Sequence, residues 1–302
     1  MRILCLGSLN FDYVYKVEHL VRSGETIAAT DRTEFCGGKG LNQAISLARA
    51  GAEVYQAGKI GGDGIELRYK MMQYGVNTDF VIVDSSLATG HAFIQVDPRG
   101  QSSIVNFGGA NFNITKQDID GILASFKPGD IILLQNEISN VVYAIAKASQ
   151  LGLRVALNPS PIDNELISHE ALACVEWFIL NEIEGYELTG QREPEDICSD
   201  LRNRYPNCRV VLTLGDKGVI YRDAEISASH GIYDVPVVDS TGAGDAFVGY
   251  FLAAIMEDAS VEKALELASK ASSLAVSRDG SADSIPSRKE VEKTDITPYK
   301  GK

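Results

Sequence analysis

A short segment toward the C-terminal end of the chain carries the residue types that phosphoryl transfer requires. It reads DSTGAGD at 239–245 and is followed by an amphipathic stretch at 246–256. Small residues at 242–244 let backbone N–H groups approach an anion closely, and the positive end of the following helix lies at the same place. Asp245 beside such an anion hole can act as a base that orients a hydroxyl for attack on phosphorus. The structural alternative is a tight turn with a capping aspartate, and the segment alone supports both interpretations about equally.

Two further segments carry groups that suit a polar ligand. The first, CGGKGLNQ at 36–43, surrounds Lys39 with glycines. Lys39 offers a point charge, and Asn42 offers both a donor and an acceptor to hydroxyl groups. The structural alternative is a glycine-rich turn that ends in an asparagine cap. The second segment, Asn10-Phe11-Asp12, follows the first predicted strand at the end where ligands gather, and an Asx turn is its common structural alternative.

Several familiar signatures are missing from the sequence. Gly40 follows the pair Gly38-Lys39, so there is no G-x-x-x-x-G-K-[ST] motif, and no G-x-G-x-x-G opens a helix after a strand. H-E-x-x-H, a Cys/His cluster and G-x-S-x-G are also missing. The sequence therefore gives no support to a P-loop nucleotidase, a dinucleotide-binding enzyme, a zinc hydrolase or a serine esterase.

The elements that must position these groups alternate along the chain. Continuously apolar runs predict buried strands at 2–6, 53–57, 130–134, 154–157, 177–180 and 209–214. Amphipathic stretches predict helices at 42–50, 64–74, 140–151 and 194–205, and Thr115 with Asp118, as well as Asp63, are candidate helix starts. This alternation predicts an α/β fold with a mostly parallel sheet covered by helices on both faces.

Two segments depart from this alternation of strands and helices. Residues 26–35 and 90–107 alternate apolar and polar side chains, and the second contains a turn at 97–100. They are expected to pair into one small sheet that covers the carboxyl ends of the main strands, where open α/β sheets bind ligands. The alternative is that they extend the edge of the main sheet. We expect a single domain over 1–302, with a lid built from insertions at about 10–36 and 89–108.

Composition limits the partners of the chain. Its 302 residues include 28 Lys and Arg against 41 Asp and Glu, a net charge of −13. Nucleic acids and anionic membrane surfaces bind clustered Lys and Arg, so we expect neither as a partner. The apolar run near the start is too short for a signal sequence, and no window approaches a membrane span. Five scattered cysteines without C-x-x-C indicate free thiols in a reducing cytoplasm.

Over nearly its whole length the chain resembles the ribokinase family of sugar kinases, the PfkB-type carbohydrate kinases. Residues 37–42, with Gly51 and Gly61 at the expected spacing, resemble the first signature of that family, and 239–245 resemble the second. Between them, NPSP at 158–161, NEIE at 181–184 and TLGDKG at 213–218 resemble blocks that ribokinases carry in the same order. One departure is Tyr250, where the family usually has a small residue, and we expect it to repack that helix.

The resemblance implies a ribokinase-like three-layer sandwich with a mostly parallel central sheet and a small β-sheet lid. It implies ATP-dependent transfer of the γ-phosphate to the primary hydroxyl of D-ribose, giving ribose 5-phosphate, and a homodimer formed through the lid. The alternatives are a kinase of the same fold for fructose, deoxyribose, pseudouridine or adenosine, or a non-catalytic sugar-binding regulator. Many ribokinases have alanine at the positions of Ser160 and Leu41, and these differences leave the identity of the phosphate acceptor undecided.

The resemblance also implies roles for individual residues. Asp245 resembles the catalytic base, and Gly242, Ala243 and Gly244 resemble the anion hole. The positions that match sugar-binding residues are Asn10, Asp12, Gly38, Lys39, Asn42, Glu137 and Asp245. The positions on the ATP side are Asn181, Glu184 (near Mg²⁺), Thr213, Gly215, Gly218 and Ser269. The positions that resemble the loops for K⁺ or another monovalent cation are Asp239, Thr241, Ala275, Arg278, Gly280 and Ser284.

Overall fold

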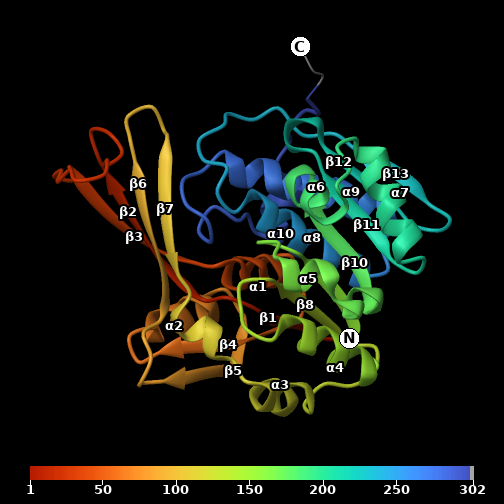
Figure 1. Ribbon diagram of the computed structural model, residues 1–302. Helices are drawn as coiled ribbons and strands as arrows, with labels where there is room; N and C mark the ends of the chain where they lie inside the picture. The colour runs from red at the N-terminus through yellow and green to blue at the C-terminus, as the bar shows by residue number, and fades with distance from the viewer. Residues whose placement is uncertain (300–302) are drawn as a thin grey trace.

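The computed structural model describes residues 1–299, and their strands form two separate sheets (Figure 1). The large sheet has nine strands in the order β13-β12-β11-β10-β9-β8-β1-β4-β5. The pairs from β11 to β5 are parallel, whereas β12 and β13 run antiparallel at one edge. The strands are β1 (Ile3–Leu6), β4 (Val54–Gly61), β5 (Asn77–Asp84), β8 (Ile131–Gln135), β9 (Arg154–Asn158), β10 (Val175–Asn181), β11 (Arg209–Thr213), β12 (Val219–Arg222) and β13 (Ser227–His230).

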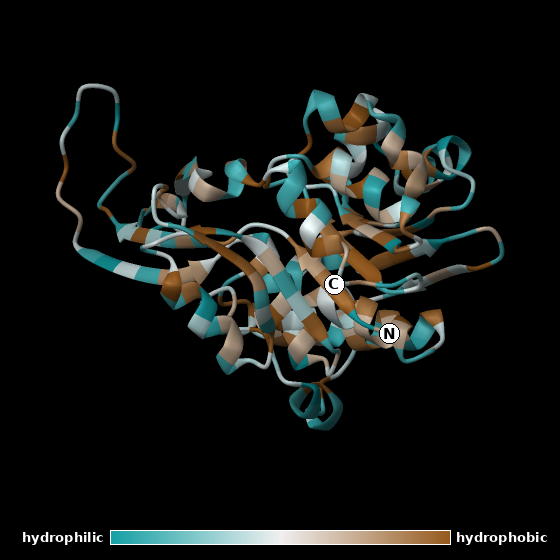
Figure 2. Cartoon of the chain, turned by 90° about the horizontal axis from the view of Figure 1, so that it is seen from below, coloured by the Kyte–Doolittle hydropathy of each residue, from teal (hydrophilic) through white to brown (hydrophobic). Residues whose placement is uncertain are grey.

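The six predicted strands of the large sheet are confirmed. All residues of β1 and β8 are buried, as the continuous apolar runs predict for strands covered on both faces. In Figure 2 brown segments gather in the middle of the body, and the helices around them alternate between brown and teal. The sequence did not predict β5, β12 and β13, because their buried and exposed residues alternate or their composition is polar.

Helices cover both faces of the large sheet. One face carries α1 (Lys39–Arg49), α2 (Ile65–Gln73), α8 (Ala243–Met256), α9 (Val261–Val276) and α10 (Arg288–Lys293). The other carries α3 (Lys116–Leu123), α4 (Val141–Gln150), α5 (Asn164–Ser168), α6 (Glu182–Thr189) and α7 (Pro194–Arg204). The predicted three-layer α/β architecture is therefore confirmed. Short 3-10 helices lie at η1 (Gly109–Asn113), η2 (Glu170–Cys174) and η3 (Gly215–Lys217).

The small sheet projects from the body on one side of the molecule (Figure 1). Its order is β3-β2-β6-β7, with β2 (Asn10–Lys16), β3 (Asp31–Gly37), β6 (Gly90–Val96) and β7 (Ser102–Phe107). The two segments with alternating apolar and polar residues, 26–35 and 90–107, thus contribute to one sheet, which the parallel pairing of β2 with β6 connects. The first strand boundary differs from the prediction, since β3 begins at Asp31 rather than at residue 26.

Local signals at helix starts were partly correct. Thr115 caps α3 in a reciprocal capping box with Asp118, as predicted. Asp63 does not cap α2, because its carboxylate accepts hydrogen bonds from the backbone and hydroxyl of Thr89 instead. Helix α1 begins at Lys39, three residues earlier than predicted, so Asn42 lies inside the helix and does not cap it.

The structure also bears on the expectations for the cysteines, for Tyr250 and for membrane-spanning helices. The cysteines are all unpaired. Tyr250 is fully buried, and its hydroxyl donates to the carbonyl oxygen of Pro286 at 2.7 Å, so the helix accommodates the large side chain as expected. No helix within residues 1–299 combines the length and apolar composition that crossing a membrane requires.

Candidate active site

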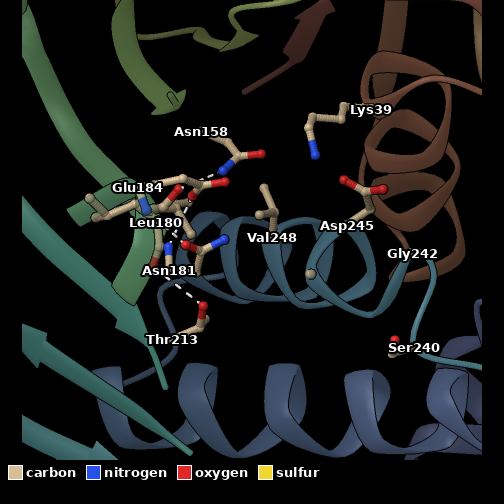
Figure 3. A pocket seen from close by; sticks show the side chains of 12 residues that line it. Lys39, Asn158, Leu180, Asn181, Glu184, Thr213, Ser240, Gly242, Asp245 and Val248 are labelled. Atoms are coloured by element: carbon tan, nitrogen blue, oxygen red, sulfur yellow. Dashed lines mark hydrogen bonds between the residues drawn. The ribbon is translucent and has the colours of Figure 1, made fainter. Parts of the chain in front are cut away.

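The carboxyl ends of the parallel strands bring polar residues to one edge of the large sheet. Asn158, Asn181 and Thr213 are the last residues of β9, β10 and β11, which are neighbours in the sheet. They line a cavity of about 230 Å³ together with residues from the starts of α1 and α8 (Figure 3). Its lining consists of Lys39, Asn158, Ile179, Leu180, Asn181, Glu184, Thr213, Ser240, Gly242, Gly244, Asp245 and Val248.

The N-terminus of α8 forms one wall of this cavity. Gly242 caps the helix in the left-handed region, with φ 75°. A Cβ there would lie 3.1 Å from the backbone of Ser281, so both the conformation and the packing favour glycine. The first N–H groups of a helix have no partner within the helix, and α8 is 14 residues long. The predicted glycines therefore sit where an anion can be bound by backbone N–H groups.

Asp245 lies in the first turn of α8 and is only 9% exposed. Two consecutive residues of α1 hold its carboxylate. Asn42 Nδ2 donates to Oδ2 at 3.0 Å, and Gln43 Nε2 donates to Oδ1 at 2.9 Å. Asn42 Oδ1 is buried and has no hydrogen-bond partner within residues 1–299.

Lys39 is the first residue of α1, and its ammonium group points toward Asp245 in Figure 3. Burial by itself would lower the pKa of Lys39, but the carboxylates of Asp245, Glu137 and Glu184 outweigh it and raise the pKa above its ordinary value. The ammonium group therefore stays protonated and neutralises part of the negative charge of the site. Its backbone N–H also donates to Glu137 Oε2 at 3.2 Å.

The predicted sugar-binding residues gather where the small sheet joins the large one. Asn10 and Asp12 are in β2, and Gly37 packs so closely on Asp12 that a Cβ would lie 2.0 Å from its Oδ2. Burial raises the pKa of Asp12 to about 6, with further contributions from the negative charges of Glu137 and Asp245. Glu137 also accepts a hydrogen bond from the hydroxyl of Ser8. Three carboxylates thus surround one region beside Lys39.

His91 does not share the face of β2 and β6 that carries Asp12. The register of these parallel strands pairs Asp12 with Ala92 and Phe11 with His91. Since successive side chains of a strand point to opposite faces, His91 lies on the face of Phe11. Its ring packs between those of Tyr13 and Phe107.

The predicted nucleotide-side residues follow β10 and β11. Asn181 and Glu184 form a capping box at the start of α6: Glu184 N donates to Asn181 Oδ1 at 2.9 Å, and Asn181 N donates to Glu184 Oε2 at 3.0 Å. Both side chains line the cavity. Gly215 and Gly218 lie in and after η3, outside the cavity lining. Ser269 is buried in α9 and does not line this cavity either.

The two predicted cation loops contact each other. Asp239 joins them, since its Oδ1 accepts from Thr241 N at 2.9 Å and its Oδ2 accepts from Gly280 N at 3.2 Å. The Arg278 side chain turns away to Glu290, at 3.1 Å, and Ser284 donates to the carbonyl oxygen of Ser281. Ala275 lies near the end of α9, at the start of the second loop. The loops therefore lie side by side, and their backbone carbonyl oxygens are the kind of ligand that K⁺ takes.

Few carboxylate donors for Mg²⁺ lie among the described residues that line the cavity. No three His, Cys, Asp or Glu side chains within residues 1–299 form a cluster that could hold a metal ion by themselves. Glu184 is a buried carboxylate that lines the cavity. Mg²⁺ in nucleotide sites usually takes one or two carboxylates together with phosphate oxygens and water, so this donor set fits.

Sequence reasoning missed several residues of the site. Asn158 belongs to the quoted NPSP block but had no predicted role, and Gln43, which is fully buried, belongs to the glycine-rich segment but had no predicted role either. Ser240 and Val248 line the cavity beside the predicted anion hole. The position of Gln43 next to Asn42 was the only sequence signal for it.

The chain is similar to known carbohydrate kinases over nearly its whole length. A profile described as pfkB family carbohydrate kinase matches residues 1–288. A ribokinase from Haemophilus influenzae is 33% identical over 294 residues, which cover 94% of this chain and 95% of the relative. A deoxyribokinase from Salmonella typhi is 31% identical over 299 residues, covering 95% of this chain and 96% of the relative. The ribokinase of Arabidopsis thaliana, solved in complex with ribose and ATP, is 32% identical, covers 97% of both chains and has a TM-score of 0.82.

Proposed function

The chain belongs to the pfkB family of carbohydrate kinases, and from this premise we propose that it transfers the γ-phosphate of ATP to the primary hydroxyl of D-ribose, giving ribose 5-phosphate. The observation that carries the proposal is the buried Asp245 at the N-terminus of α8, opposite Lys39 and near the carboxylates of Asp12 and Glu137. The similarity to ribokinases, one of them solved with ribose and ATP, supports ribose as the acceptor.

In this proposal Asp12 and Asn10 hold hydroxyl groups of the sugar, and Asn42 accepts a further hydroxyl at its unpaired Oδ1. Asp245 accepts the proton of the primary hydroxyl while that oxygen attacks the γ-phosphorus. The leaving ADP keeps the electron pair of the broken P–O bond. Positioning and charge stabilisation do most of the work, because a hydroxyl held in line with a phosphate needs little further activation.

Negative charge that develops on the transferred group is stabilised by this chain at two places. Gly242, Ala243 and Gly244 present backbone N–H groups at the positive end of α8, and Lys39 adds a full charge. Mg²⁺ held near Glu184 and Asn181 would supply neutralisation of the phosphate oxygens. We assign Thr213, Gly215, Gly218 and Ser269 to the nucleotide side, and the carbonyl oxygens of the loops around Asp239, Thr241, Ala275, Arg278, Gly280 and Ser284 to K⁺.

We assign two further properties to the molecule. The small sheet acts as a lid over the sugar, which excludes water and limits wasteful hydrolysis of ATP, and its exposed apolar residues form a homodimer interface. Unpaired cysteines support a reducing compartment, the cytoplasm.

A deoxyribose kinase is the second candidate, and the deoxyribokinase relative of similar identity supports it. A substrate panel of ribose, deoxyribose, fructose, pseudouridine and adenosine distinguishes the two. The proposal expects ribose to be phosphorylated fastest, and negligible turnover of ribose beside rapid turnover of another acceptor would refute it.

The same panel tests the assigned base. Asp245→Asn keeps the size of the side chain but cannot accept a proton, so we expect the rate with the best acceptor to fall about 10²-fold or more, within the range of general-base catalysis. Binding of the acceptor, measured by calorimetry, should be retained. Turnover at the wild-type rate would refute the role of Asp245, and loss of binding together with activity would instead indicate a role in holding the sugar.

A further inference from the structure

Gln43 is fully buried in α1 and contacts the carboxylate that we assign as the base. We infer that Gln43 is a positioning residue for the transfer reaction: it fixes the plane of the Asp245 carboxylate without touching either substrate. This inference rests on the proposed function of Asp245 and adds a residue to it.

The hydrogen bonds of Gln43 determine which way its amide group points. Nε2 donates to Asp245 Oδ1 and to Asn158 Oδ1, both at 2.9 Å, and Oε1 accepts from Gln135 Nε2 at 2.6 Å. If the amide were flipped, Oε1 would face two acceptor oxygens and Nε2 would face a donor. The three contacts therefore select one orientation, with the NH₂ group toward Asp245.

Gln43 and its neighbour Asn42 differ in how many of their polar atoms already have hydrogen-bond partners. Asn42 also donates to Asp245, but its buried Oδ1 has no protein partner within residues 1–299, so one of its polar atoms is not engaged. In Gln43 both N–H donors and the carbonyl oxygen are already engaged with other protein groups. Gln43 can therefore act on the reaction only through Asp245 and Asn158.

The contact has two physical consequences for Asp245. The donor on Oδ1, together with the Asn42 donor on Oδ2, leaves the carboxylate little freedom to rotate. The donor is also fixed before the substrates arrive, so no reorganisation is needed during the reaction. Because the same NH₂ group holds Asn158, which lines the cavity, Gln43 ties the base to the wall of the cavity at the end of β9.

The first test replaces Gln43 by Met, which has a similar shape and no N–H donor. With the acceptor that wild type turns over fastest in the panel, we expect kcat to fall about 10- to 100-fold, the size of effect that a displaced catalytic group produces. KM for the acceptor should change less than about threefold. A kcat within about twofold of wild type would overturn the inference.

The second test, Gln43→Glu, gives a signature that a purely structural role would not produce. Two carboxyl groups at this distance share one proton at low pH, and the protonated carboxyl group of the variant can donate to Asp245 as the amide does. At higher pH both groups ionise and repel each other. The activity of the variant relative to wild type should therefore fall steadily as the pH is raised from about 6 to about 9. A ratio that stays constant over this range would contradict the inference.

Two further variants separate positioning from stability. Gln56→Met removes an equally buried glutamine in β4, whose Nε2 donates to the carbonyl oxygens of Gly7 and Ala57, and it should lower the melting temperature without changing the pH profile.

Gln135→Met keeps the experiment decisive if Gln43→Met does not fold. It frees Gln43 Oε1, so it should lower kcat with little change in KM, and an unchanged kcat would overturn the inference. Since all variants are compared on the best acceptor of wild type, an error in the sugar assignment leaves these outcomes intact.

Discussion

At the scale of single residues, the ligand-free site holds more negative charge, from Asp12, Glu137 and Asp245, than Lys39 can neutralise. Burial and the charges of Glu137 and Asp245 raise the pKa of Asp12 to about 6. Lys39 is the basic side chain that lines the cavity beside these groups, and the carboxylates of Asp245 and Glu137 raise its pKa as well. A sugar hydroxyl that donates to Asp12 would relieve part of this unfavourable charge. The arrangement thus favours binding of a ligand rich in hydroxyl donors.

The pKa of Asp12 leads to a prediction about stability. Its pKa is higher in the folded state, about 6, than the ordinary value of 3.8, so its ionisation penalises the folded state. The penalty is fully present above the folded pKa and disappears as the pH falls toward the unfolded value. Asp12→Asn should therefore stabilise the ligand-free protein at about pH 8 by at most about 3 kcal/mol, from about 2 pKa units at about 1.36 kcal/mol each.

Urea unfolding at about pH 8, 6 and 4 measures this effect. The stabilisation by Asp12→Asn should be largest at the highest pH and vanish near the lowest. Asp295→Asn, at an exposed position, serves as the control and should change stability little at any pH. A gain that is absent at high pH, or independent of pH, would contradict the origin of the Asp12 pKa.

At the scale of elements, the close approach of α1 and α8 brings Asp245 to its two amide partners. Gly249 of α8 faces Ser46 of α1, and a Cβ on it would lie 2.2 Å from Ser46 Oγ and 2.7 Å from the backbone N of Leu47. Ser46 Oγ donates to the carbonyl oxygen of Ala246 at 2.9 Å across the same contact. Glycine at 249 is therefore required by the packing, not by the backbone conformation.

Gly249→Ala should separate the two helices. We expect a loss of stability of about 1–3 kcal/mol, as for other overpacked cores, and a fall in kcat because Asp245 moves away from Asn42 and Gln43. Thermal unfolding and steady-state kinetics measure the two effects. Gly121→Ala in α3 is the matched control, since a Cβ there meets no atom within 4 Å in the described part of the chain. It should be neutral or stabilise the helix by up to about 1 kcal/mol. If Gly249→Ala behaves like this control, the contact does not position the base.

At the scale of the whole molecule, the net charge of −13 does not prevent binding of phosphates. The cavity places Lys39 and the N-terminus of α8 at one edge of the sheet, where both can contact a phosphate although carboxylates lie beside them and the chain as a whole is acidic. The acidic balance in turn disfavours association with nucleic acids. A local field built from peptide dipoles, one lysine and bound cations fits a small phosphate ligand.

The small sheet carries the apolar surface that we assign to a homodimer. Phe93, Val105 and Phe107 are exposed and lie on the face of β6 and β7 opposite Asp12. Exposed apolar side chains gathered on one sheet face favour association, and pairing with a second copy would bury them. The opposite face, with Asp12, then remains directed at the sugar.

Light scattering after gel filtration tests the dimer. Wild type should have twice the mass of the chain, and Val105→Glu should shift it to the monomer because a charge is placed in the buried interface. Val237→Glu introduces the same charge at an exposed valine outside the small sheet and should leave the mass unchanged. A monomeric wild type would refute the proposed interface.

The sequence alone determined the strand–helix alternation, the order of the motifs and the chemical groups of the site. Buried strands were predictable because a strand covered on both faces must be apolar throughout, as in β8. The place of Asp245 and Lys39 in a ligand site could be predicted, because small residues beside a charged side chain let backbone N–H groups approach an anion closely. By contrast, the predicted cap at Asp63 was wrong, because a contact with Thr89, 26 residues away, competes for its carboxylate.

Only the tertiary structure decided which groups act on each other. Gln43 and Asp245 are 202 residues apart in the chain, and no local pattern pairs them. The raised pKa of Asp12 likewise depends on its burial and on carboxylates from other parts of the chain. The direction of a hydrogen bond and the cost of a buried charge are set by distances in space, and a linear sequence does not contain them.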